Sequence, residues 1–311
     1  MRPKCPFPAL LSFSVALWLC PLAGGAAEPV EAGRTAATAE IDVTRLQSDA
    51  ERGDADAQFQ LGTLYAAGKG VKRDPAKAAE YYTQAADHGN VMAMNDLASC
   101  YFNGSGVKRD ENEAARWFRE AADKGSDLAA DNLGTLYLQG VGVQKDAKAA
   151  AEWFRRAANL GLRSAQVHLG KLYYFGDLDL PKDYVEAAKW ISEAARKGDA
   201  WAQNTMGAMY QQGDGVEKDP GKGLEFLRSS ALQGYAKAQA NLGAAYFRGT
   251  GTARDFALAD QWLTLSAEQG EITAIKMRLQ VEGEIKAKDR DRARKLVAEF
   301  KASKNAAKFS D

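Results

Sequence analysis

The chain has 311 residues, with 41 Lys plus Arg against 41 Asp plus Glu, so its formal net charge at pH 7 is zero. This balance excludes a strongly basic nucleic-acid-binding protein and a protein with an acidic tail. Because 46% of the residues are hydrophobic, the chain has enough apolar side chains to bury a core, which excludes wholesale disorder.

The first 27 residues have the three-part pattern of a secretory signal peptide. A positive start, Arg2 and Lys4, is followed by an apolar stretch over residues 7–22 and then by small residues up to Ala26 and Ala27. This order predicts a signal peptide cleaved near these two alanines, and therefore a periplasmic or secreted protein. A retained membrane anchor is the alternative, although the apolar stretch is short for a membrane span.

The cysteines agree with export of a chain without disulfides. Cys5 and Cys20 fall within the predicted signal peptide, so the mature chain keeps Cys100 alone and has no partner for an intrachain disulfide. Stability must then come from packing. Residues 28–39 show no apolar periodicity, and we expect a flexible lead-in there.

The rest of the chain repeats itself with a period of 36 residues. A glycine closes each unit: Gly53, Gly89, Gly125, Gly161, Gly198, Gly234 and Gly270. These glycines bound six units, of which the fourth is one residue longer: 54–89, 90–125, 126–161, 162–198, 199–234 and 235–270. Self-similarity at such a period is the signature of a repeat architecture.

Three further positions recur in every unit. The first is a tyrosine: Tyr65, Tyr101, Tyr137, Tyr173, Tyr210 and Tyr246. The second is an aspartate after a glycine-containing turn: Asp74, Asp110, Asp146, Asp183, Asp219 and Asp255. The third is an aromatic residue seven positions after the aspartate: Tyr81, Trp117, Trp153, Trp190, Phe226 and Trp262. The fourth unit replaces the usual Gly-x-Gly-Val turn by residues 176–181.

Each recurrent position has a physical reason. Apolar and small residues at i, i+4 and i+8 before the turn predict one face of a first helix. The aspartate is a favourable N-cap of a second helix, and the closing glycine is a favourable C-terminal cap. Neither helix can bury its apolar stripe alone, whereas stacked pairs can. We expect Trp153 to be buried between its own repeat and the next.

The units resemble Sel1-like repeats, relatives of the tetratricopeptide repeat with a longer, glycine-containing loop between the helices. The resemblance covers residues 54–270 and implies an all-α fold, an α-solenoid forming a right-handed superhelix of six helix-turn-helix repeats. Residues 40–53 resemble a lone second helix and would cap the N-terminal end. Residues 271–311 resemble a decayed seventh pair and would provide degenerate C-terminal capping helices.

Residues with chemical potential have structural explanations. His88 falls at the end of a second helix, His168 occupies a polar position of a first helix, and Cys100 aligns with Leu64 and Leu136 in the predicted core. The Gly-x-Gly turns follow helices and lack the Gly-Lys-Ser/Thr ending of a phosphate-binding loop. We therefore expect no catalytic residue, metal or cofactor, and we expect that the protein is not an enzyme.

A positive residue precedes the aspartate in all six units. We call these residues the basic ridge: Arg73, Arg109, Lys145, Lys182, Lys218 and Arg254. The simpler interpretation is a set of solvated loop charges beside the aspartates. The alternative is a contact surface for an anionic polymer, such as an acidic polysaccharide or a cell-wall polymer.

The first helices carry two variable positions, one directly after the tyrosine and one before a conserved alanine. By analogy with tetratricopeptide arrays, these positions face a concave groove. Their apolar members, with the adjoining Phe175, form the predicted partner-binding groove: Met92, Phe102, Leu128, Leu138, Tyr174, Phe175, Trp201 and Phe247. Exposed aromatic clusters are typical anchors for a partner, and core packing is the alternative explanation.

The sequence thus predicts an exported scaffold or adaptor that binds a protein or peptide, and no nucleic acid. The resemblance implies roles in envelope assembly, host interaction or regulation of a membrane signalling complex, without choosing among them. After signal cleavage we expect no stable membrane insertion.

Overall fold

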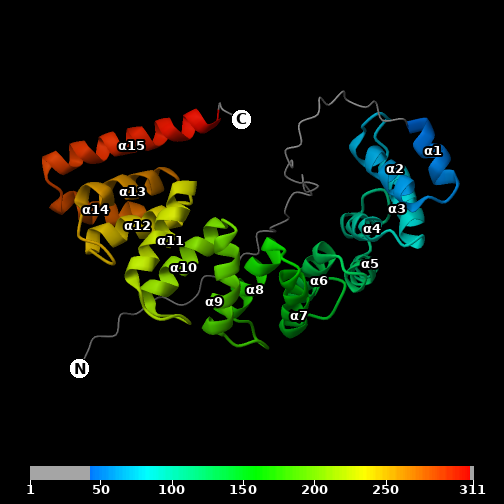
Figure 1. Ribbon diagram of the computed structural model, residues 1–311, viewed down its shortest axis with the longest axis horizontal. Helices are drawn as coiled ribbons and strands as arrows, with labels where there is room; N and C mark the ends of the chain where they lie inside the picture. Colours follow the sequence, from blue (N-terminus) through cyan, green and yellow to red (C-terminus); the bar gives the residue numbers. More distant parts are fainter. Residues whose placement is uncertain (1–42, 309–311) are drawn as a thin grey trace. The chain divides into compact units, whose positions relative to one another are not determined.

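The computed structural model describes residues 43–308, which form fifteen helices and no β-strand (Figure 1). The predicted signal peptide, residues 1–27, and the predicted lead-in, residues 28–39, lie outside the described residues. Within residues 43–308, no helix is both long and apolar enough to cross a membrane.

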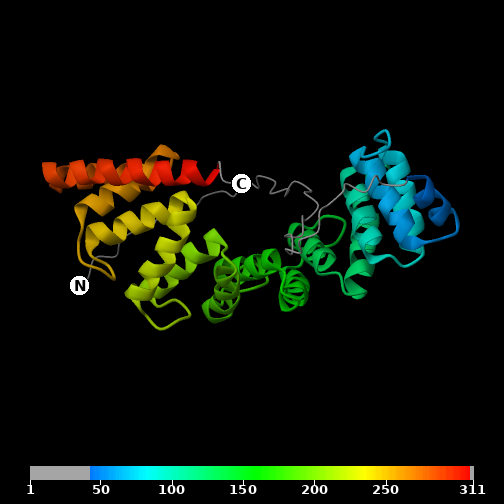
Figure 2. The same ribbon diagram turned by 45° about the horizontal axis from the view of Figure 1, so that its top comes forward.

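Each of the six repeats contributes two helices. We call the first helix A: α2 (Ala55–Ala67), α4 (Val91–Asn103), α6 (Asp127–Gln139), α8 (Arg163–Phe175), α10 (Ala200–Gln212) and α12 (Ala236–Arg248). We call the second helix B: α3 (Pro75–Asp87), α5 (Glu111–Asp123), α7 (Ala147–Asn159), α9 (Tyr184–Arg196), α11 (Pro220–Gln233) and α13 (Phe256–Glu268). Each helix A packs against the helix B of its own repeat, and from α4 on also against the helix B of the preceding repeat (Figures 1 and 2). The predicted all-α solenoid is confirmed.

The recurrent aspartates cap helix B, as the sequence predicts. Asp74, for example, accepts hydrogen bonds from the backbone N–H groups of Ala76 and Lys77, both at 3.1 Å. In all six repeats the backbone N–H of the aspartate donates to the carbonyl of the recurrent tyrosine, at 2.9–3.1 Å. The aspartate therefore satisfies orphan groups at the end of helix A and at the start of helix B.

A small residue in helix A lets helix B approach closely. A Cβ atom at Gly62 would lie 2.6 Å from the Tyr82 ring, and one at Gly134 would lie 2.7 Å from the Phe154 ring. The residue that fills this notch stands eight positions after the capping aspartate and is at most 5% exposed in every repeat: Tyr82, Phe118, Phe154, Ile191, Leu227 and Leu263. This contact fixes the pairing of the two helices.

The prediction that Trp153 is buried was wrong. Its indole is half-buried, and the Arg156 guanidinium lies 4.4 Å from the centre of the ring, whereas the next residue, Phe154, is 1% exposed. Successive residues of a helix point about 100° apart. Since Phe154 fills the notch, Trp153 lies at the edge of the helix–helix interface.

The two ends of the array differ. At the N-terminal end, α1 (Val43–Glu51) packs against α2. At the C-terminal end, α14 (Ile272–Glu284) packs against α13 in the place of a further helix A, but α15 (Ala287–Lys308) runs along α13 (Figure 2). The expectation of a decayed seventh pair therefore needs correction, because α15 does not cover α14 as a helix B would.

Candidate functional site

The solvent-exposed side of the A helices, here called the helix A face, carries most of the predicted groove residues. Met92 and Leu128 stand near the starts of α4 and α6, and Phe175 ends α8. Their exposed fractions are 59%, 54% and 52%, respectively. Large apolar side chains that remain this exposed contribute little to folding, so the core-packing explanation is weakest for these three.

Four other predicted groove residues are half-buried. Phe102, Leu138, Tyr174 and Trp201 pack against the main core cluster while keeping part of their surface exposed. The Tyr174 ring meets the Phe175 ring edge-on at 5.0 Å between centroids. These residues connect the exposed side chains to the core, so the apolar surface of the helix A face is continuous with packed residues.

Phe247 must be removed from the predicted groove. It is 9% exposed and belongs to the C-terminal core cluster, with its ring edge-on to Phe256 at 5.8 Å. Arg254 lies over the Phe247 ring at 5.5 Å and donates from Nε to the Phe247 carbonyl at 2.8 Å. Phe256 stands at the start of α13 and fills space over Phe247, which the sequence comparison did not anticipate.

Lys171 is a feature of the helix A face that sequence reasoning missed. Its ammonium group lies 4.8 Å from the centre of the Trp201 ring on the neighbouring helix A. Burial lowers the pKa of Lys171, and the nearby charge of Asp199 opposes that shift. A signal existed, because the equivalent positions hold small residues: Thr63, Ser99, Thr135, Ala208 and Ala244.

Polar side chains link successive A helices across the same face. Asp131 is buried; it accepts a hydrogen bond from the Ser164 hydroxyl at 2.8 Å and lies 2.8 Å from Nδ1 of His168. The carboxylate therefore stands between the serine and the imidazole, whereas a nucleophilic triad needs the imidazole between the other two. This arrangement supports a structural role for His168, in line with the sequence interpretation.

The basic ridge is exposed in every repeat, but several of its members have local partners. Arg109 forms an ion pair with Glu111, Lys145 with Asp177 at 3.1 Å, and Arg254 with Glu284 at 3.8 Å. Arg73 donates from Nε to the Ala66 carbonyl at 3.2 Å. Lys182 and Lys218 form no ion pair within residues 43–308. These contacts favour a role in the loops themselves.

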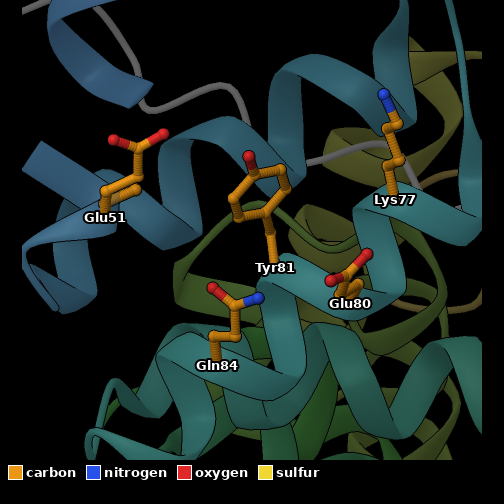
Figure 3. A pocket seen from close by; sticks show the side chains of 6 residues that line it. Glu51, Lys77, Glu80, Tyr81 and Gln84 are labelled. Carbon is orange, nitrogen blue, oxygen red and sulfur yellow. The ribbon is translucent and has the colours of Figure 1, made fainter. Parts of the chain in front are cut away.

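A hollow of ≈ 200 Å³ lies between α1 and α3, and Figure 3 shows Tyr81 standing there between Glu51 and Glu80. Burial, followed by the neighbouring Tyr65 and these two carboxylates, raises the pKa of Tyr81. Its hydroxyl is therefore protonated at neutral pH and is a poor nucleophile.

Cys100 and the acidic side chains give no further site. Cys100 is buried, and burial together with Asp96 raises the pKa of its thiol to about 11. A thiol with this pKa carries little thiolate at neutral pH and is unreactive. Between residues 43 and 308, no three His, Cys, Asp or Glu side chains are arranged to hold a metal ion.

Comparisons with known proteins agree with the repeat fold. A family model described as Sel1 repeat matches residues 55–90, 91–126, 127–162, 163–199, 202–235 and 236–271. Among solved structures, the chain is similar to a protective antigen present in uropathogenic Escherichia coli strains that displays an SLR fold. The two are 35% identical with a TM-score of 0.74, and the match covers 83% of this chain and 56% of that one.

A Sel1 repeat protein from Oxalobacter formigenes is also similar. It is 31% identical with a TM-score of 0.59, and the match covers 73% of this chain and 100% of that one. The chain thus spans little more than half the length of the Escherichia coli antigen. No curated protein sequence matches it.

Proposed function

Because the chain belongs to the Sel1-repeat family, we propose that it is an exported scaffold whose helix A face binds a protein or peptide partner. Proteins built from Sel1 repeats generally act as protein–protein interaction scaffolds, and the family is typically non-catalytic. The single observation that carries the proposal is the exposure of Met92, Leu128 and Phe175 along one helix A face.

The half-buried Trp201 extends this apolar surface. Together with Lys171 it adds an aromatic ring and a positive charge beside the exposed Phe175, which follows Lys171 by one helical turn. Aromatic side chains in a well-packed surface, such as Trp201, are typical binding hot spots. Asn132 donates to Asn95 at 3.3 Å, and Asn241 donates to Asn204 at 2.9 Å, so amide groups lie on the same face.

Export is the second part of the proposal. The predicted signal peptide over residues 1–27 supports it, and so does the similarity to an antigen of uropathogenic Escherichia coli. Envelope assembly, host interaction and regulation of a membrane signalling complex are the settings in which such a scaffold would act. Mass spectrometry of the exported protein should show a start at Ala27 or Glu28. Full-length chain in the membrane fraction would instead indicate a retained anchor.

Site-specific photo-crosslinking tests the binding surface. A benzoylphenylalanine residue at position 128 or 175 should capture the partner in cells. The same residue at position 185 should not, because Val185 is 69% exposed but belongs to helix B α9. Equal capture at all three positions would contradict the proposal.

Substitutions give the energetic counterpart of the crosslinking. The double change Leu128→Ala and Phe175→Ala should weaken partner binding at least about tenfold, with little change in thermal stability. Trp201→Ala should lower both affinity and stability because the indole also packs on the core. A binder of anionic glycan, using the basic ridge, is less supported, since three of the six ridge residues pair with carboxylates within the chain.

A further inference from the structure

The C-terminal helix α14 exposes the face that helix B covers in complete repeats. In the sixth repeat, Gln239 accepts a hydrogen bond from Gln269 at the end of α13, at 2.8 Å. A Cβ atom at Gly243 would lie 2.7 Å from Leu263 of the same helix. The residues 36 positions later are Ile275 and Leu279, and both are exposed.

The face is open because of where α15 lies. Phe300 of α15 meets the Trp262 ring of α13 edge-on at 5.4 Å. Arg292 pairs with Asp255 at 2.9 Å, and Lys301 pairs with Glu268 at 2.8 Å. These contacts hold α15 along α13, and Ile275 and Leu279 on the helix B side of α14 stay exposed.

The exposed face is more apolar than a solvent-facing helix requires. Ile272, Ile275 and Leu279 are 65%, 47% and 68% exposed, and their spacing of three and four residues puts them on one side of α14. Four of the six repeats carry Gln and Gly at the last two positions, as the sixth does with Gln239 and Gly243, whereas α14 carries Ile and Leu there. A continuous stripe of this kind favours contact with another apolar surface.

Charge indicates what kind of helix fits. Residues 272–304 contain 10 Lys plus Arg against 5 Asp plus Glu, a net charge of +5. Residues 43–271 contain 27 against 31, a net charge of −4. Lys276 adjoins Ile275 within the stripe, and Lys286 and Lys288 follow the end of α14 directly. The C-terminal end is therefore electropositive relative to the rest of the repeats.

We propose that the apolar stripe of α14 docks an acidic amphipathic helix from a partner protein. The partner helix takes the place that helix B occupies in a complete repeat. Because α14 carries Leu279 where α12 carries Gly243, it offers no notch for a large side chain, so the partner helix presents a small residue opposite Leu279 and differs from the chain's own B helices. Its acidic residues face Lys276 and the first turn of α15.

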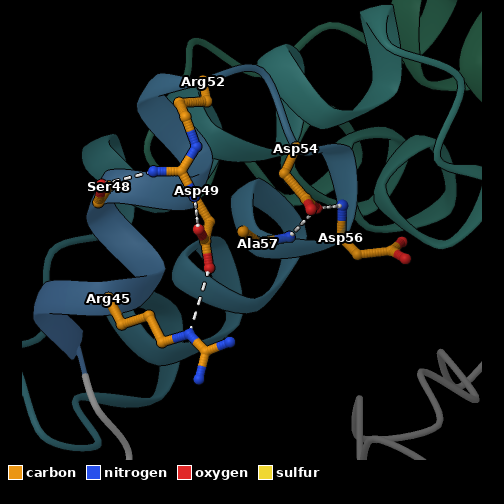
Figure 4. Close-up of polar contacts among 7 residues, drawn as sticks. All are labelled: Arg45, Ser48, Asp49, Arg52, Asp54, Asp56 and Ala57. Atoms are coloured by element: carbon orange, nitrogen blue, oxygen red, sulfur yellow. Dashed lines mark hydrogen bonds and ion pairs between the residues drawn. The ribbon is translucent and has the colours of Figure 1, made fainter.

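A second copy of the chain is a poorer occupant. Two α14 surfaces would bring two ends of net charge +5 together. Pairing with α1 of another copy fails for a different reason, since the outer surface of α1 is polar. The Arg52 guanidinium donates a hydrogen bond to the Ser48 hydroxyl at 2.9 Å and forms an ion pair with Asp49, and Arg45 Nε lies 3.8 Å from the same carboxylate (Figure 4).

A displayed library of random 16-residue peptides tests the proposal. The full mature chain is the target, and the variant carrying Ile275→Ser and Leu279→Ser is used for counter-selection. Both substituted side chains are exposed, so the fold should be kept, and a thermal melt verifies this. Peptides enriched on the native chain should have apolar residues three and four apart, a small residue among them, and an excess of Asp and Glu.

Binding of the enriched peptides then gives the decisive measurement. By fluorescence anisotropy, Ile275→Ser with Leu279→Ser should weaken binding at least tenfold. The matched control Leu178→Ser should leave affinity unchanged, because Leu178 is 99% exposed in the turn between α8 and α9, away from α14. Raising the salt concentration should weaken binding, and Trp201→Ala, which tests the helix A face, should not.

Three outcomes would overturn the inference. Enriched peptides that bind the double variant as well as the native chain would remove α14 from the interaction. Self-association of the native chain that is lost in the double variant, seen by sedimentation, would assign the stripe to a second copy. Binding to vesicles of anionic phospholipid, lost in the same variant without any stripe-dependent peptide, would assign it to a membrane surface.

Discussion

The third and fourth repeats are neighbours whose four helices each contain 13 residues, yet they secure the same positions with different contacts. In the third repeat, Gly142 brings the turn against the start of the preceding helix B, so closely that a Cβ atom would lie 2.0 Å from the Glu111 carbonyl oxygen. In the fourth repeat, Asp179 makes the equivalent contact by accepting a hydrogen bond from the Ala147 N–H at 3.1 Å.

The difference shows that a repeat conserves a contact rather than a residue. Glycine makes the contact where the turn touches the backbone of the preceding helix B. A carboxylate side chain makes it where the turn lies further from that helix. The fourth turn gains a second attachment, because Asp177 pairs with Lys145 at 3.1 Å. One member of the basic ridge is thereby used to hold two repeats together.

The largest expected effect tests the recurrent aromatic position. Trp190 in the fourth repeat is 4% exposed and donates from Nε1 to Glu186 at 3.1 Å, whereas Trp153 in the third is half-buried. We expect Trp190→Ala to cost about 3–5 kcal/mol and Trp153→Ala about 1–2 kcal/mol, since the cavity left behind grows with burial. Urea unfolding monitored by circular dichroism measures both. Equal losses would show that the two positions are not different.

How far the sequence predicts the fold follows from this case. The capping aspartates and closing glycines act within a few residues of themselves, so their roles could be inferred from spacing. Trp153 and Phe154 are adjacent large residues, and which one fills the notch depends on how the two helices cross. The sequence repeat alone does not determine the crossing angle of the two helices.

In the candidate site too, the sequence predicts what depends on a residue's own position and not what depends on tertiary contacts. Exposure of Met92, Leu128 and Phe175 agrees with their variability between repeats. Burial of Phe247 depends on Phe256, a large residue at the start of α13, and the open face of α14 depends on the docking of α15. Both are tertiary contacts made by residues outside the positions compared.

The next effect concerns the turn that touches the preceding repeat. Gly142→Ala should destabilise the protein by about 2–3 kcal/mol, because the new Cβ meets backbone and φ is +66°. Asp179→Ala should cost about 1 kcal/mol, the usual loss for a carboxylate that caps a helix start. Thermal melts of the two variants rank them. A larger loss for Asp179→Ala would reverse the comparison between a backbone contact and a side-chain contact.

A stabilising change tests a defect of the fourth repeat. Gln166 donates to the Ala158 carbonyl at 3.2 Å, but its buried Oε1 has no hydrogen-bond partner among the described residues. In the first repeat the same atom of Gln58 is met by His88 at 2.8 Å, and in the fifth Gln233 donates to Gln203 at 2.7 Å. Lys197, at the equivalent place, donates to the Gly161 carbonyl instead.

Lys197→Gln should therefore raise the free energy of unfolding by about 0.5–1 kcal/mol, because it pairs a buried acceptor while giving up one exposed hydrogen bond. The matched control is Lys124→Gln in the second repeat. There Met94 takes the place of Gln166, and its side chain has no oxygen that could accept a hydrogen bond. Differential scanning calorimetry compares the two. A gain shared by both variants would mean that the glutamine acts through helix propensity and not through Gln166.

The smallest expected effect is a pH dependence confined to the fourth turn. Burial alone would raise the pKa of Asp177, but the Leu178 N–H and the Lys145 ammonium outweigh it and lower the pKa below its usual range. A carboxyl group whose pKa is lowered by folding stabilises the protein above its unfolded pKa of about 4, and that contribution is lost as the pH falls through the folded value.

Because the Lys145 side chain is 48% exposed, solvent screens the ion pair with Asp177, and the coupling free energy should be about 0.5 kcal/mol. A double-mutant cycle with Lys145→Ala and Asp177→Asn should give that coupling at pH 7, and the coupling should disappear as the pH falls through the lowered pKa and the carboxyl group becomes protonated. A coupling that persists after the carboxyl group is protonated would mean that the fourth turn is held by its shape and not by this charge.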